Sequence, residues 1–190
     1  MGKKSQRNAN CIIEKALIDY CSPTLASLKT AALFTLFTPS NGGLRDWDRR
    51  LKPFGIRLCV LKKAPSFMLV YVFRPARLAE DLNSVAASAL LNQCGYRSLY
   101  PKDAIKELKR RLAENEEFPH EIGLFLGYPV EDVAGFIRHG GLGYKYSGCW
   151  KVYGDKARAE AVFAGYRKCR EVYGRLWRQG KSVLQLTVAV

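Results

Sequence analysis

Two β-rich runs separated by a short loop constrain the fold of this chain most. Residues 56–61 read Ile-Arg-Leu-Cys-Val-Leu, residues 67–73 read Phe-Met-Leu-Val-Tyr-Val-Phe, and the five residues between them include Pro65. Runs rich in branched and aromatic side chains that are joined in this way indicate an antiparallel hairpin. The second run is apolar at consecutive positions, which is typical of a strand covered on both faces. We therefore predict a sheet whose central strand is formed by 67–73.

The rest of the chain predicts an α+β fold, with helices covering this small sheet. Further strands are predicted at 30–36 and 148–153, so that a mostly antiparallel sheet has about four strands. Apolar periodicity and end signals predict helices over 10–20, 44–54, 75–93 (broken near residues 83–84), 102–114, 130–137 and 155–178, the last being the longest.

We predict a single domain over residues 1–190, because this length suits one hydrophobic core. Within it, an N-terminal α/β part covers about 10–100 and a helical part with one strand covers about 101–180. The apolar tail at 181–190 is predicted to add an edge strand or to dock on the core.

Charge and cysteine usage narrow the functional classes. The formal net charge is +14, but residues 1–95 carry 14 basic and 6 acidic side chains and residues 96–190 carry 17 and 11, so the excess is spread evenly. A nucleic-acid-binding arm would concentrate it in a block. The six cysteines include no CxxC pair, which disfavours both a disulfide framework and a zinc site. We predict reduced thiols and no metal ligands.

The expected location is the cytoplasm, without a membrane partner. No run approaches the ~18 apolar residues of a membrane span. The start of the sequence is basic, but no apolar core and small-residue cleavage site follow it, as they would in a signal peptide.

The segment 118–129 holds the first candidate site. It places His120, one of two histidines, beside Glu121 in an apolar run that also holds two prolines and two glycines. Histidine titrates near neutral pH and a carboxylate can orient it, so His120 and Glu121 are candidate acid–base residues. The pattern is not HExxH, because position 124 is leucine. The competing interpretation is a helix start, where Glu121 favours the positive end of the helix dipole.

Residues 120–138 also resemble a helix-turn-helix, which would bind nucleic acid. In that arrangement Val133 and Ile137 pack inward. The outward positions of the second helix would be Glu131, Asp132, Ala134 and Gly135. Carboxylates at that place repel phosphate, and none of the four side chains is a usual reader of bases. A helical hairpin used only for packing is the simpler interpretation, and nucleic-acid binding is kept as the alternative function.

A glycine-rich loop and an aromatic segment follow this block. The loop 138–143 reads Arg-His-Gly-Gly-Leu-Gly, whose backbone N–H groups suit a phosphate or carboxylate although the order is not that of a P-loop. The segment 144–153 mixes aromatic and cationic side chains, which suits a planar ligand but is equally typical of a half-buried strand. The candidate ligand-binding residues are Tyr128, Arg138, His139, Lys145 and Trp150.

Cys21 is the candidate nucleophile if the protein is an enzyme. It precedes Pro23, where a turn after the first helix would expose a thiol. Reactivity requires a lowered thiol pKa, and no cation-rich motif nearby indicates one. The alternative is a small buried hydrophobic side chain, which also suits Cys169 on the apolar stripe of the last helix.

Three motifs together resemble a family of small bacterial proteins of unknown function. They are CSPTLA at 21–26 with Leu28-Lys29, FPHEIGLFLGYPVEDVAGFI at 118–137 and WKVYGD at 150–155. The resemblance covers most of the chain and implies a cytoplasmic protein, without a biochemical role that transfers. Cys149 stands where the resemblance leads us to expect an aromatic residue, so Cys149 is a poor candidate for an essential group.

These observations predict a cytoplasmic protein that binds a small anionic or planar ligand. The site would lie where 118–129 meets 138–146, with the imidazole of His120 opening onto a hollow shared with the segment before Tyr144. A link to redox or metal chemistry, the cofactor, the reaction class and the oligomeric state all stay open.

Overall fold

The computed structural model describes residues 2–37, 41–114 and 117–189. The chain divides into two compact units, which are described separately below. Unit 1 comprises residues 1–75 and 168–190, and unit 2 comprises residues 76–167. Residues 76–100, which the sequence grouped with the N-terminal part, thus lie in unit 2.

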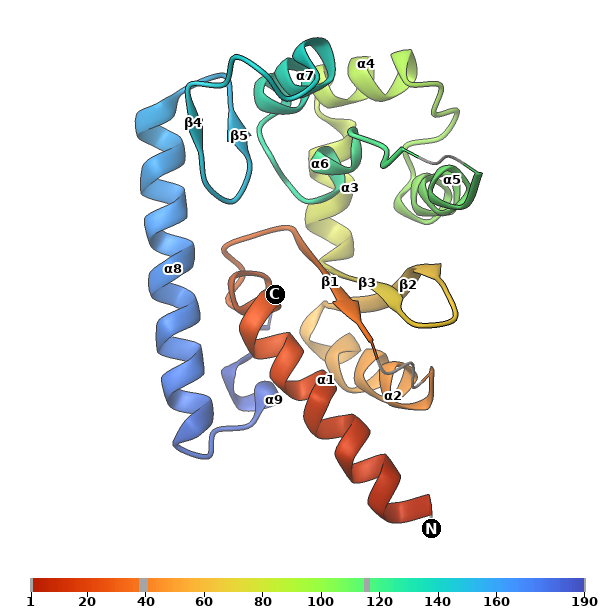
Figure 1. Ribbon diagram of the computed structural model, residues 1–190, viewed down its shortest axis with the longest axis vertical. Coiled ribbons are helices and arrows are strands. Elements are labelled where there is room, and N and C mark those ends of the chain that lie inside the picture. The colour runs from red at the N-terminus through yellow and green to blue at the C-terminus, as the bar shows by residue number, and fades with distance from the viewer. Residues whose placement is uncertain (1, 38–40, 115–116, 190) are drawn as a thin grey trace. The chain divides into compact units, whose positions relative to one another are not determined.

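Unit 1 is built on a three-stranded antiparallel sheet. Its strands are β1 (Ala31–Leu36), β2 (Arg57–Lys63) and β3 (Met68–Phe73), in the order β1-β3-β2. The β2–β3 hairpin and the central position of β3 confirm the predictions from their apolar pattern (Figure 1). The α+β fold class is also confirmed.

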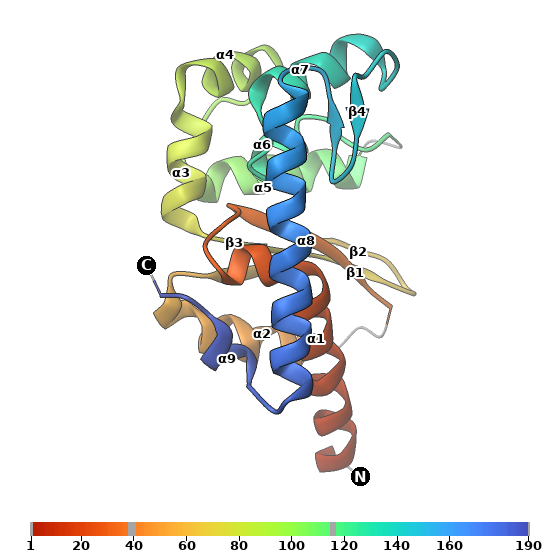
Figure 2. The ribbon, with the colours of Figure 1, turned by 90° about the vertical axis from the view of Figure 1, so that its left-hand side faces the viewer.

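Helices α1 (Gly2–Leu25) and α2 (Asn41–Leu51) pack against one face of this sheet (Figures 1 and 2). A short 3-10 helix (Lys52–Phe54) continues α2, and helix α9 (Val183–Leu186) contacts α1. The core between them includes side chains that are almost fully buried, among them Leu17, Leu25, Trp47, Met68, Val70 and Val183. The apolar tail therefore docks on the core through a short helix, and it adds no strand to the sheet within the described residues.

The first helix extends beyond the predicted 10–20 at both ends, and Pro23 does not end it. Helix α1 runs through Leu25 and contains Pro23 within its last turn. A proline inside a helix removes one backbone donor. The missing donor is the one that would bond to the carbonyl of Asp19, and the helix continues for two residues beyond the proline.

Arg74 holds several segments of unit 1 together. Its buried guanidinium donates to the carbonyl oxygens of Thr24 (2.8 Å) and Leu25 (3.0 Å), which end α1. It also donates to the carbonyl oxygens of Phe54 (3.3 Å) and Val188 (2.8 Å). A planar group with five donors suits this task, because one side chain satisfies the orphan carbonyls of a helix end and of the tail.

Unit 2 is mainly helical. Its elements are α3 (Pro75–Asn83), α4 (Val85–Gln93), α5 (Pro101–Glu114), α6 (Ile122–Phe125), α7 (Val130–His139), β4 (Tyr146–Ser147), β5 (Lys151–Val152) and the first part of α8 (Lys156–Arg178). The break between α3 and α4 falls at Ser84, where it was predicted, and α8 matches the predicted long helix. No helix in the described ranges is long and apolar enough to cross a membrane.

The predicted strand at 148–153 is wrong in detail, because that segment belongs to a hairpin of its own. Strands β4 and β5 pair with each other around the turn 148–150, and Val152 packs on Ala159 and Phe163 of α8. A Cβ atom at Gly148 would lie 2.2 Å from the ring of Phe163. Glycine is therefore required for the hairpin to lie this close to α8.

Candidate functional site

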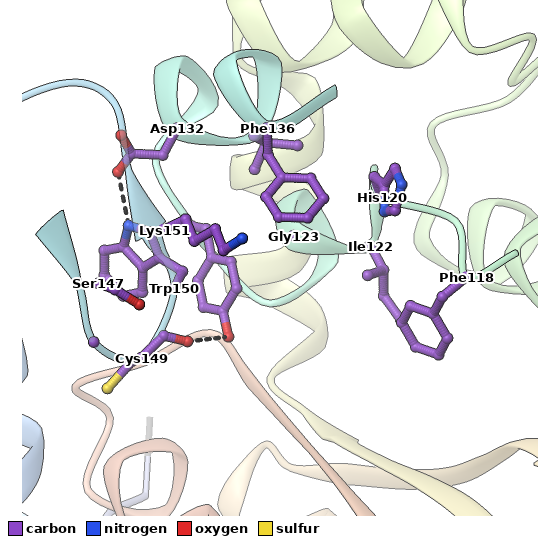
Figure 3. Close-up of a pocket in the computed structure, with 13 residues that line it drawn as sticks. Phe118, His120, Ile122, Gly123, Asp132, Phe136, Ser147, Cys149, Trp150 and Lys151 are labelled. Atoms are coloured by element: carbon purple, nitrogen blue, oxygen red, sulfur yellow. Dashed lines mark hydrogen bonds between the residues drawn. The ribbon is translucent and has the colours of Figure 1, made fainter. Parts of the chain in front are cut away.

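A pocket of about 320 Å³ lies in unit 2, between the segment leading into α6, helix α7 and the β4–β5 hairpin (Figure 3). Its walls are mostly apolar. Five aromatic rings line it, and three separate segments contribute them: Phe118, His120, Tyr128, Phe136 and Trp150.

Trp150 and Tyr128 form one wall. Their rings are stacked with centroids 4.7 Å apart, and Trp150 meets the ring of Phe163 edge-on at 4.4 Å. The Tyr128 hydroxyl donates to the carbonyl oxygen of Cys149 at 3.4 Å. Burial raises the pKa of Tyr128 above its ordinary value, so this phenol stays protonated at neutral pH. The wall is a rigid, uncharged aromatic surface.

Asp132 joins α7 to the hairpin. Its carboxylate is 3% exposed and accepts hydrogen bonds from the Trp150 indole Nε1 (2.7 Å) and from the backbone N–H groups of Tyr153 (2.7 Å) and Gly154 (2.8 Å). Asp132 also lies in the first turn of α7, where the helix dipole favours negative charge. These donors hold the indole of Trp150 in the wall of the pocket.

The predicted inward and outward faces of α7 are partly wrong. Val133 is buried as predicted, but Asp132 and Gly135 are buried too, and Ile137 is exposed. The reason is the hairpin, which covers the side of α7 that was expected to face solvent. A Cβ atom at Gly135 would lie 2.4 Å from the ring of Tyr153, so only glycine permits this contact.

The polar groups of the pocket are few. His120 is exposed and meets the ring of Phe136 edge-on, with centroids 4.8 Å apart. The Lys151 ammonium donates to the carbonyl oxygen of Gly141 at 2.6 Å and lies 5.6 Å from the ring centroid of Phe136. Through this bond the glycine loop supports the pocket, although none of its residues lines it.

Glu121 is adjacent to His120 in sequence but faces a different environment. Its buried carboxylate accepts hydrogen bonds from the Tyr96 hydroxyl (3.2 Å) and from Arg111 Nη1 (3.4 Å). Burial, and next the charge of Glu121, raise the pKa of Tyr96. Glu121 therefore fixes the segment at the start of α6 to α5, while His120 faces the pocket.

The other candidates from the sequence lie outside the pocket lining. Arg138, His139 and Lys145 are exposed; His139 stacks on Tyr153 at 5.7 Å, and Lys145 donates to the carbonyl oxygen of Gly154 at 2.9 Å. Cys21 belongs to the core of unit 1, where it is 0% exposed and burial raises the pKa of its thiol. Of the eight candidates, His120, Tyr128 and Trp150 line one pocket.

Ten of the thirteen residues that line this pocket were not candidates from the sequence, among them Phe118, Phe136 and Lys151. Phe118 and Phe136 look like ordinary core side chains in the sequence, and Lys151 looks like any solvent-exposed strand lysine. One signal was available for Phe136, which lies four residues after Asp132 and hence on the same face of α7.

Unit 2 has a second cavity, which is larger and polar. It measures about 640 Å³ and is lined by the α4–α5 connection and α5, with Arg110 and Arg111 in its wall. Both arginines are already paired, Arg110 with Glu107 and Glu114, and Arg111 with Glu107 and Glu121. The charges of these two arginines are therefore compensated, but Arg97 and Lys106 also line the cavity, and none of its lining residues is aromatic. In the described part of the chain, no group of three or more His, Cys, Asp or Glu side chains is placed to hold a metal ion.

Comparison with known proteins identifies the family of this chain. A family model described as "Protein of unknown function (DUF3793)" matches residues 17–187. No curated protein and no solved structure matches the chain at a significant level. The matched range includes every residue that lines the aromatic pocket.

Proposed function

We propose that this chain, which belongs to the DUF3793 family of proteins of unknown function, binds a small planar aromatic molecule in the pocket between α6, α7 and the β4–β5 hairpin. Family membership confirms the resemblance to a family of proteins of unknown function and assigns no activity. The observation that carries the proposal is the cavity of about 320 Å³ with its five aromatic rings. Mostly apolar walls with a few placed polar groups are typical of small-molecule sites, and this volume lies at the lower end of their range.

The organisation of the rings supports a flat ligand. Trp150 is held on one side by Phe163 and by the hydrogen bond to Asp132, so it presents its surface without losing side-chain freedom on binding. Offset stacking on such a ring contributes about 0.5–1.5 kcal/mol beyond area burial. In this proposal the exposed imidazole of His120 contacts the edge of the ligand.

Nucleic-acid binding through α7 receives no support from these contacts. The carboxylate of Asp132 is used within the protein, and Glu131, beside it, is exposed at the end of the helix that would approach the backbone. Helix α6, the first helix of that motif, has four residues. Small-molecule binding therefore remains the function that we propose.

We also propose that the protein is located in the cytoplasm. None of the six cysteines forms a disulfide bond within the described residues, which suits a reducing compartment.

Filling the pocket tests the proposal. Ser147 is exposed and lines the pocket, so Ser147→Phe adds a ring there without removing a core side chain. We expect planar aromatic probes such as indole and quinoline to bind the wild-type protein and to lose about tenfold or more in affinity in this variant, because the added ring occupies their place. Ligand-observed NMR titration measures this difference.

Ser147→Ala is the matched control, since it keeps the pocket open and should bind the probes as the wild type does. Thermal unfolding of both variants checks that they are folded. Equal binding by Ser147→Phe and Ser147→Ala, or no binding by the wild type, contradicts the proposed site.

A further inference from the structure

We propose that the ligand of this pocket carries one acidic group beside its ring, and that Lys151 binds this group. The inference rests on the proposed function and deepens it by naming the charge of the ligand and the residue that selects it.

One hydrogen bond holds the ammonium group of Lys151 in position and leaves its other N–H donors for a ligand. Its ammonium group donates one hydrogen bond, to the carbonyl oxygen of Gly141 at 2.6 Å. A lysine ammonium has three N–H donors, so two remain for a ligand. Figure 3 shows the amine among the rings of the pocket, near Phe136. None of the ion pairs among the described residues involves Lys151.

The surroundings of this ammonium favour an anion over a neutral group or a cation. Its Nζ atom lies 5.0 Å from the ring centroid of Tyr144 and 5.6 Å from that of Phe136, so apolar rings replace part of its hydration. Charges interact more strongly where water is displaced. A carboxylate on a stacked ring would accept a charge-assisted hydrogen bond, whereas a ligand cation would be repelled.

Asp132 also lines the pocket, but it does not neutralise Lys151. Oxygen Oδ1 accepts from the backbone of Tyr153 and Gly154, and Oδ2 accepts from the Trp150 indole. Because three donors and the helix dipole already stabilise this carboxylate, its charge is largely compensated within the protein. Of the two charged side chains that line the pocket, Lys151 is therefore the one that can recognise a charged ligand.

Three probes with one ring system test the sign of the ligand charge. They are indole, its carboxylate derivative and its aminomethyl derivative, substituted at the same ring carbon. We expect the wild-type protein to bind the carboxylate about tenfold more tightly than indole, because hydrogen bonds to charged groups are the stronger ones. The aminomethyl derivative should bind more weakly than indole. Ligand-observed NMR titration gives the three affinities.

Two substitutions of Lys151 and one control complete the test. Lys151→Met should remove the preference for the carboxylate while indole still binds. Lys151→Glu should reverse it in favour of the aminomethyl probe, a gain that an unfolded protein would not produce. Lys145→Met is the matched control: Lys145 also donates to a backbone carbonyl near the hairpin but does not line the pocket, so its removal should leave all three affinities unchanged.

The outcomes separate the two proposals. If indole and its carboxylate bind the wild type equally and Lys151→Met changes neither, the role of Lys151 is overturned while the aromatic site stands. If none of the probes binds the wild type, the proposed function itself fails, and the inference fails with it.

Discussion

A buried carboxylate can shape a pocket through its bonds within the protein, and Asp132 has this position. Its three donors come from residues 18 to 22 positions further along the chain. Helix α7 and the hairpin are thereby connected through one side chain, and the ring of Trp150 is oriented by the same bonds. We assign Asp132 a positioning role in the site.

Asp132→Asn should destabilise the protein by about 2–3 kcal/mol, because one carboxylate oxygen becomes an NH₂ group that faces a donor and leaves it unpaired. Urea unfolding measures the change in free energy. A positioning role also predicts that indole affinity falls in native conditions and that the tryptophan fluorescence spectrum shifts, since Trp150 loses its acceptor.

Glu131→Gln is the control for Asp132→Asn, because Glu131 is its exposed neighbour on α7. It should change stability by no more than ~0.5 kcal/mol and leave the fluorescence unchanged. An Asp132→Asn protein with wild-type stability and spectrum would contradict the assignment.

Single-residue features explain why only part of the site was predictable. The aromatic character of Tyr128 and Trp150 made them candidates, His120 stood out in an apolar run, and the structure places all three in the lining of one pocket. A carboxylate on a short helix, in contrast, is normally exposed, so Asp132 was expected to face solvent. Lys145 and Lys151 both lie in the aromatic and cationic segment 144–153, so the sequence does not distinguish them. The fold of the hairpin determines that Lys151, and not Lys145, lines the pocket.

At the scale of elements, long patterns were predictable and short ones were not. The β2–β3 hairpin and α8 carry apolar repeats over many residues, which is enough to identify a strand pair or a helix. Strands β4 and β5 have two residues each, too few for an alternation to show. Their pairing depends on contacts with Phe163 and Asp132, which are distant in the sequence and invisible to periodicity.

Helix α2 and strand β2 are joined by a carboxylate whose effect depends on pH. Asp48 accepts hydrogen bonds from the Arg57 side chain (2.9 and 3.0 Å) and from the backbone N–H of Leu58 (2.8 Å). Burial acts to raise the pKa of Asp48, but these hydrogen bonds and the charge of Arg57 outweigh it and leave the pKa below its usual value. A lowered pKa means that Asp48 stabilises the fold above the pKa of the unfolded chain, and that this stability is lost as the pH falls.

Asp48→Asn should therefore cost about 1 kcal/mol near neutral pH, a value reduced by the partial exposure of the pair. The difference from the wild type should shrink as the pH falls below about 4 and the wild-type carboxylate takes up a proton. Urea unfolding at a series of pH values measures it. Asp46→Asn, on the exposed side of the same helix, is the control and should show little effect. A difference that does not change with pH would refute the ionic role of Asp48.

At the scale of the whole molecule, the charge of +14 is a general property, while the pocket is local. Positive charge spread over the surface attracts any polyanion, and such binding weakens steeply with salt because it releases counterions. We expect weak retention of DNA in filter-binding assays at low salt and its loss near physiological salt, without sequence preference. Ser147→Phe should leave this retention unchanged, since the substitution alters no charge, while it removes probe binding. DNA binding that persists at physiological salt and is abolished by Ser147→Phe would instead make the pocket part of a nucleic-acid site, and the small-molecule proposal would then be wrong.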